Sequence, residues 1–333
     1  MPKLAQTTAI YPLLSLRRLE RLLMVDRDLI KSTADKAASY YDSFDIYKGK
    51  RKDGTEKWRH IDNPTSDLRN LQDAIYSKLL KPIAPKLPPY LSGGMPGRSI
   101  LDNALPHLGK AAVVTLDIEG CFPNIKHKRI FAVWRNDLGC SEDIASMLTQ
   151  LTTLQTRLPQ GAPTSPMLCN LALQPLAEEI QAYALSKDLT YTQYVDDITI
   201  SGNKNSVRQA VTDLIPIVRR HGYNLGNDKI NIMDSNEIQK TTGLKINKSI
   251  TITKEKISAI RSEIMRIESL GNNVKTYELN RVWGQIYFLK SINPTRGTVM
   301  QTLAKKKLAN LIGTYEPKPA DKTRKCKDFS NKH

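Results

Sequence analysis

Two adjacent carboxylates between two β-prone runs constrain this chain more than any other feature. The segment LTYTQYVDDITISG sets Asp196 and Asp197 side by side, as at the tip of a β-hairpin. Like charges this close repel, and each raises the pKa of the other unless a positive charge compensates. Either solvent or a bound cation must accommodate the pair. Because Asp is common in turns, the pair alone does not decide between them.

A third carboxylate ends another short apolar run. The segment AAVVTLDI reads as a buried strand that finishes at Asp117 and Ile118. An ionised carboxylate there is costly unless it is paired or bound to metal. If this strand end meets the hairpin tip, three carboxylates converge. Hard oxygen ligands of this kind suit Mg²⁺, and two such ions activate a hydroxyl and hold a leaving pyrophosphate.

The charge balance indicates a polyanionic partner. The 333 residues carry a net charge of +17, and residues 245–333 hold nineteen Lys/Arg against seven Asp/Glu. This concentration favours nucleic acid, with an anionic membrane surface or simple solubility as alternatives. No apolar run approaches the roughly 20 residues that span a bilayer. The four scattered cysteines fit a reducing cytoplasm, so we expect a soluble cytoplasmic protein.

Local patterns predict a mixture of helices and strands. Residues 13–40 have apolar positions at helical spacing, and residues 41–63 read as a β-hairpin around Asp53-Gly54. The run at 111–118 reads as a strand, and 189–202 as the hairpin that carries the two carboxylates. From about Lys254 the pattern becomes helical again.

The order of four motifs resembles the palm series of reverse transcriptases: VVTLDIEGCFPNI, LPQGAPTSP, YVDD and GYNLGNDKI. The resemblance implies an α+β fold shaped as a right hand with fingers, palm and thumb. It also implies RNA-directed DNA synthesis with two Mg²⁺ ions. Asp117, Asp196 and Asp197 match the catalytic, metal-binding carboxylates, and the Ile118 carbonyl is a further expected ligand. Lys229 matches the lysine that protonates the leaving pyrophosphate.

The same resemblance assigns residues to the incoming deoxynucleotide. Phe122 matches the aromatic position that rejects a 2′-hydroxyl, and Gln160 and Gly161 match the pair that contacts the nucleotide and the templating base. Arg59 matches the fingers arginine that grips the triphosphate, with Lys52 as a second candidate. Arginine suits this task because it binds phosphate bidentately.

Two further stretches resemble signatures of the retron reverse transcriptases. GRSILDNALPHLGK contains Asn103-Ala-x-x-His107, which a helix would set on one face. QKTTGLKIN resembles a Val-Thr-Gly signature, with Thr241 in place of the valine and Thr242 and Gly243 retained. The resemblance implies that Asn103, His107, Thr242 and Gly243 contact RNA, with a structural helix cap as the alternative for the first stretch.

The retron resemblance also predicts a domain order and a biological role. We expect N-terminal helices and fingers at 1–110, palm at 111–245 with a fingers segment near 130–165, thumb at 246–313 and a basic tail at 314–333. Lys305, Lys306 and Lys307 would grip RNA phosphates. The enzyme would copy part of a structured non-coding RNA into DNA from a 2′-hydroxyl primer, in anti-phage defence with a separate effector protein. The alternatives are another bacterial or group II intron-like reverse transcriptase, or a non-catalytic RNA-binding scaffold.

Overall fold

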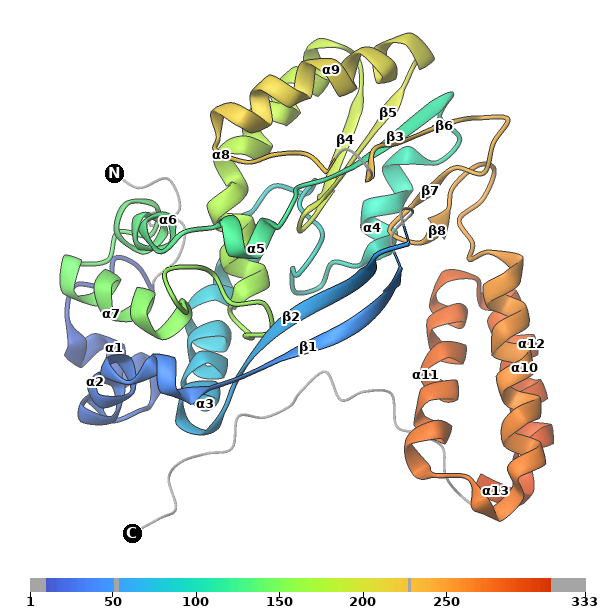
Figure 1. Cartoon of the computed structure of the whole chain (residues 1–333), viewed down its shortest axis with the longest axis horizontal. Helices are drawn as coiled ribbons and strands as arrows, with labels where there is room; N and C mark the ends of the chain where they lie inside the picture. Colours follow the sequence, from blue (N-terminus) through green and yellow to red (C-terminus); the bar gives the residue numbers. More distant parts are fainter. Residues whose placement is uncertain (1–9, 51–53, 227–228, 313–333) are drawn as a thin grey trace.

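The fold combines an antiparallel sheet, a long two-stranded ribbon and two groups of helices (Figure 1). The computed structural model describes residues 10–50, 54–226 and 229–312. Along these ranges, no helix combines the length and apolar character needed to cross a membrane. The predicted α+β class is confirmed.

The N-terminal helical stretch is two helices rather than one. α1 (Leu16–Leu23) ends at Met24, which adopts the left-handed conformation with φ of 57°. α2 (Arg27–Asp35) follows, and its N-cap Asp26 accepts hydrogen bonds from the amides of the first turn through its carboxylate. The expectation of helix across residues 13–40 therefore missed a break that the Asp26 N-cap indicates.

The predicted hairpin at 41–63 is confirmed. β1 (Tyr41–Lys50) pairs antiparallel with β2 (Glu56–Pro64), and the register shifts between Tyr47 and Lys50. Nearly every residue of β1 is exposed, so the ribbon stands away from the core. Lys52, the second triphosphate candidate, lies outside the described residues.

The central sheet has the strand order β4-β5-β3-β6, with every neighbouring pair antiparallel. Its strands are β3 (Ala112–Asp117), β4 (Thr190–Tyr194), β5 (Asp197–Gly202) and β6 (Asn231–Asp234). Side chains alternate between its faces. Val114, Leu116, Ile198 and Ile200 are buried on one face, and the polar Thr199 and Ser201 lie on the other.

Helices cover both faces of this sheet. α8 (Ser165–Ser186) and α9 (Lys204–Arg220) pack on the apolar face (Figure 1). On the polar face lie α4 (Ile100–Ala104) and the 3₁₀ turn at Leu105–His107. The remaining helices of this half are α3 (Ser66–Ile75), α5 (Cys121–Asn124), α6 (His127–Ala132) and α7 (Glu142–Thr152).

The C-terminal helices form a bundle with its own core. α10 (Lys254–Leu270), α11 (Thr276–Ile292) and α12 (Pro294–Lys307) pack around Trp283, and α13 (Ala309–Ile312) follows (Figure 1). Val113 and Met233 of the sheet belong to the same apolar cluster. A short hairpin, β7 (Lys240–Thr241) and β8 (Leu244–Lys245), precedes the bundle. The predicted domain boundaries stay predictions.

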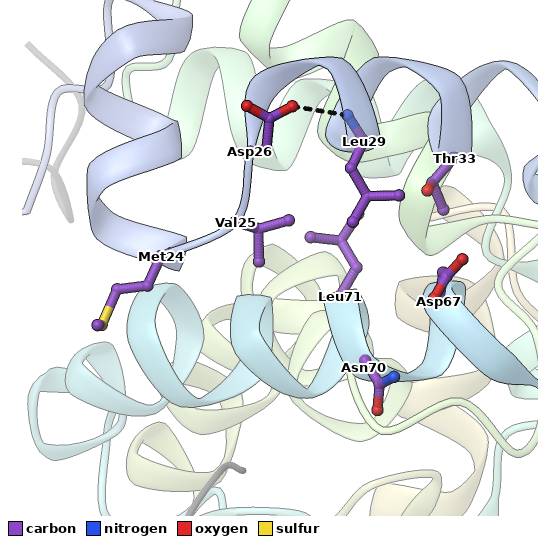
Figure 2. A pocket seen from close by; sticks show the side chains of 8 residues that line it. All are labelled: Met24, Val25, Asp26, Leu29, Thr33, Asp67, Asn70 and Leu71. Carbon is purple, nitrogen blue, oxygen red and sulfur yellow. Dashed lines mark hydrogen bonds between the residues drawn. The ribbon is translucent and has the colours of Figure 1, made fainter. Parts of the chain in front are cut away.

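A small cleft separates α2 from α3 in the N-terminal helices (Figure 2). Leu29 and Leu71 point toward each other across it, and Asp26 Oδ1 accepts the 3.3 Å hydrogen bond from Leu29 N. The cleft has a volume of about 270 Å³. None of its lining residues belongs to the motifs identified in the sequence.

Candidate active site

The register of the central strands brings the carboxylates to one edge of the sheet. Asp117, the last residue of β3, lies directly opposite Asp197, the first residue of β5. Asp196 occupies the turn just before, where its carbonyl accepts a 3.0 Å hydrogen bond from Ile118 N. The alternation that buries Ile198 on the apolar face turns Asp117 and Asp197 toward the polar face.

This edge concentrates negative charge that two cations partly offset. Asp197 lies at the exposed strand end, where desolvation by the surrounding protein, together with the charges of Asp196 and Asp117, raises its pKa to about 6. Desolvation also raises the pKa of Asp196. Lys229 and Arg59 lower both pKa values. Lys229 Nζ also donates a hydrogen bond to Asp117 Oδ2.

The oxygen donors of Asp117, Asp196 and Asp197 are of the kind that divalent cations prefer. Within the described residues, no three His, Cys, Asp or Glu side chains already stand in a coordinating arrangement. The Asp117 carboxylate is engaged by Lys229, so a bound cation would compete with that lysine for it. A bound cation would then relieve the repulsion that raises the pKa values. Two backbone hydrogen bonds join this strand end to the segment 224–226: Gly226 N donates to Asp117 O, and Glu119 N donates to Asn224 O. Neither bond uses the carbonyl oxygen of Ile118.

The turn that carries Asp196 is conformationally strained. Tyr194 and Asp197 pair across a two-residue connection. Within it Val195 has φ of 60°, where a β-branched residue is an outlier. A Cβ at Gly93 would lie 2.5 Å from Val195 N, so glycine is required for this close approach. Strain of this kind is characteristic of functional sites.

A buried carboxylate, Asp62, joins the ribbon to the loop that carries Gln160. Arg157 donates two hydrogen bonds to Asp62, of 2.7 and 3.3 Å. The Gln160 amide lies 3.3 Å from the same carboxylate, and Asp62 N donates to Gln160 O at 2.9 Å. Burial alone would raise the pKa of Asp62, but the hydrogen bonds and charge of Arg157 lower it below its usual value.

Two of the predicted nucleotide-binding residues, Arg59 and Gly161, lie beside this junction. Arg59 lies three residues before Asp62 on β2. Gly161 has φ of 140°, and a Cβ there would lie 2.7 Å from the Asp62 carbonyl oxygen. Phe122 lies in α5, five residues after Asp117, and is partly buried against the main core. Sequence reasoning did not identify Asp62 or Arg157, because they lie 95 residues apart and no local motif links them.

The two signature stretches meet in a buried polar network. Asn103 is fully buried, donates a 3.0 Å hydrogen bond to Thr241 Oγ1 and accepts one from Ser92 at 3.0 Å. The Thr241 hydroxyl also lies 2.7 Å from that of Thr199 on β5. His107, fully buried as well, lies within hydrogen-bonding distance of two further hydroxyls, Ser201 Oγ (2.6 Å) and Thr192 Oγ1 (2.8 Å).

The other predicted RNA contacts lie nearer the surface. Thr242 and Gly243 form the two-residue turn between β7 and β8, both with positive φ. Gly243 is exposed and Thr242 is half-buried. Lys305 and Lys306 are exposed on α12, whereas Lys307 lies 3.1 Å from Glu268 of α10.

Comparison with known proteins decides the family. Residues 48–259 match the model of the family "Reverse transcriptase (RNA-dependent DNA polymerase)". The retron Ec86 reverse transcriptase of Escherichia coli is 33% identical over 250 residues, which cover 74% of this chain and 76% of that protein. The chain belongs to the retron reverse transcriptases. The retron Se72 reverse transcriptase of Salmonella heidelberg is 28% identical over 82% of this chain and 73% of its own length.

Membership in this family confirms three predictions: RNA-directed DNA polymerase activity, an RNA template, and the retron branch rather than another reverse transcriptase or a non-catalytic scaffold. Among solved structures, the telomerase of Candida albicans aligns with a TM-score of 0.42 and 10% identity, over 83% of this chain and 61% of that one. This alignment is too loose to support an inference about the retron enzyme.

The burial of Asn103 and His107 favours the structural alternative for the first signature stretch of this retron reverse transcriptase. Neither side chain reaches the surface of the described structure, and the predicted contact with RNA stays a prediction. Their network instead links the segment before the thumb to β5, which carries Asp197. The alternative structural role fits this arrangement. Thr241, the departure from the family's valine, contributes the hydroxyl that joins the two stretches.

The buried histidine predicts a pH dependence of stability. Burial, with a smaller effect of Lys110, lowers the pKa of His107 to about 3. The unfolded chain therefore takes up this proton near pH 6.5, and stability is lost as pH falls from about 6.5 toward 3. Between pH 7.5 and pH 5 the loss should be about 2 kcal/mol. The free energy of unfolding, measured in urea at several pH values, should fall more steeply toward pH 5 for the parent enzyme than for His107→Gln. Equal slopes would contradict a neutral buried His107.

Proposed function

We propose that this enzyme copies part of a structured non-coding RNA partner into single-stranded DNA, beginning from a 2′-hydroxyl of that RNA. The proposed catalysis rests on one observation: Asp117 lies opposite Asp197 in the sheet, with Asp196 beside them. The retron relatives support the choice of RNA. The family resemblance extends the proposal to anti-phage defence with a separate effector protein, and the scattered cysteines favour the cytoplasm.

The three carboxylates would hold two Mg²⁺ ions, with the Ile118 carbonyl as a further ligand. When bound, such ions neutralise charge on the phosphates and lower the pKa of the attacking hydroxyl. The hydroxyl oxygen attacks the α-phosphorus of a deoxynucleoside triphosphate, a new phosphodiester bond forms, and the bond to pyrophosphate breaks. Lys229, whose ammonium already reaches Asp117, is the proposed proton donor to the departing pyrophosphate.

The ribbon and loop would bind the incoming nucleotide. Arg59 would engage the triphosphate, and its charge already acts on Asp196 and Asp197. Gln160 and Gly161 would contact the nucleotide and the templating base through a backbone that Asp62 fixes.

Replacing Phe122 with Ala should let ribonucleotides compete with deoxyribonucleotides, because the mutation removes the ring proposed to meet a 2′-hydroxyl. We expect discrimination, measured as the ratio of kcat/KM values in primer extension, to fall by about tenfold or more, which corresponds to a contact worth roughly 1.4 kcal/mol. Phe122→Tyr should keep discrimination. If a folded Phe122→Ala enzyme discriminates against ribonucleotides as strongly as the parent does, Phe122 serves only in packing.

Sequencing the nucleic acid that copurifies with the full chain tests the proposed product. We expect one RNA species joined covalently to a short DNA through a 2′-phosphodiester. Enzyme with Asp196→Asn and Asp197→Asn should carry the same RNA without the DNA. Unlinked or mixed RNA with the parent enzyme would contradict the proposed RNA partner and priming mode.

A further inference from the structure

The C-terminal helical bundle of α10, α11 and α12, which corresponds to the predicted thumb, contains a groove that the catalytic proposal does not use. It runs between α10 and α11 and has a volume of about 460 Å³. Its lining combines an aromatic ring, three aliphatic side chains and four polar or charged groups, and includes Phe288, Lys256, Glu263, Arg281 and Gln285. Volumes of this size are typical of small-molecule and nucleotide sites.

Phe288 gives the groove an open aromatic surface. Phe288 is 44% exposed, whereas the neighbouring Leu289 is fully buried in the bundle core. Single exposed apolar residues are common and need no ligand. Phe288 differs because it lines a groove together with cationic and amide side chains. An aromatic face of this kind provides a platform on which a base stacks.

The polar side chains provide contacts for a phosphate and a base edge. Lys256 and Arg281 are exposed cations. Arg281 pairs with Glu263, and one such contact leaves further N–H donors on its guanidinium. Glu263 also accepts two 2.9 Å hydrogen bonds from Arg266, so its charge is compensated. The exposed Gln285 offers both a donor and an acceptor.

The groove lies beside a signature turn. A Cβ placed on Gly243 would lie 3.2 Å from Lys256 Nζ, so the lysine covers the turn between β7 and β8. The exposed part of that turn and the groove therefore form one continuous surface at the base of the thumb.

The geometry points to a site for one unpaired nucleotide of the RNA partner, with its base against Phe288, its base edge at Gln285 and its phosphate at Lys256 and Arg281. This inference rests on the proposed RNA partner. Arg281 already pairs with Glu263, so an apolar peptide would leave Lys256 without an anionic partner, whereas a nucleotide engages both the ring and the lysine.

Binding of fluorescein-labelled single-stranded oligoadenylate to the full-length variants tests the site. Phe288→Ala should weaken binding by about tenfold, a typical loss when a stacking aromatic is removed, and Phe288→Tyr should retain it. Val299→Ala, a 65% exposed α12 residue outside the groove, is the matched control and should bind as the parent does. Lys256→Ala should reduce the slope of log affinity against log salt by about one unit.

Primer extension by the parent on an artificial primer–template separates this inference from the proposed function. Suppose that a folded Phe288→Ala enzyme binds oligoadenylate as tightly as the parent does, while the parent synthesises DNA and copurifies with RNA. That result would overturn the proposed nucleotide site and leave the proposed function intact. Equal weakening for oligoadenylate and for a blunt RNA duplex would also overturn it, because a paired base cannot enter. Selective loss of single-strand binding would support it.

Discussion

DNA synthesis on a primed RNA template should fall by about a thousandfold or more when Asp196 and Asp197 are both replaced by asparagine. The amides keep the shape of the side chains but lose the charges that would hold Mg²⁺. RNA binding should change little, because the exposed cations of the thumb remain. Single-nucleotide extension measures the first effect, and a filter or anisotropy assay with RNA measures the second.

Asp188→Asn is the matched control for this double replacement. Asp188 is an exposed residue with φ of 52°, a conformation that asparagine adopts readily. Its replacement should leave both DNA synthesis and RNA binding at the parental level. Residual synthesis within tenfold of the parent in the double variant would contradict the assigned role of the two carboxylates.

Removal of the Asp62 carboxylate should have the second largest effect. Asp62→Ala leaves the Arg157 guanidinium, only 20% exposed, without its partner. Breaking a buried pair of this kind costs about 3–5 kcal/mol. The junction between β2 and the Gln160 loop should loosen, so the KM for deoxynucleotides should rise more than kcat falls. Urea unfolding and steady-state primer extension measure the two effects.

An exposed ion pair in the same part of the chain provides the comparison. Asp73 pairs with Arg69 one turn away on α3, and both side chains are more than 40% exposed. Asp73→Ala should therefore cost only about 0.3–0.5 kcal/mol and leave KM unchanged. Similar stability losses in the Asp62 and Asp73 variants would argue against the Asp62 junction.

Local sequence patterns predicted the elements that carry the catalytic edge. Alternation and turn residues identified the 41–63 ribbon, the strand ending at Asp117 and the hairpin of Asp196-Asp197, because each signal lies within one short segment. The break at Met24 was missed, since apolar residues at helical spacing continue on both sides of it.

Contacts between distant segments were not predictable from such patterns. Lys229 contacts Asp117 although the two are 112 residues apart, and His107 is buried. Both observations depend on how the sheet folds back on itself. The signature stretch was expected at an RNA surface, whereas the chain uses it inside the protein. A polar motif does not reveal whether its hydrogen-bond partners are protein or nucleic acid, because both offer the same donors and acceptors.

Iron-directed cleavage of the polypeptide tests the metal site most directly. In this measurement Fe²⁺ replaces Mg²⁺, and ascorbate with peroxide then cuts the backbone beside the bound ion. We expect fragments that end near residues 117 and 196–197, suppressed by excess Mg²⁺ and lost in the Asp196→Asn, Asp197→Asn enzyme. Cleavage that persists unchanged in this variant, or that falls only elsewhere in the chain, would contradict the assignment of these carboxylates as the metal site.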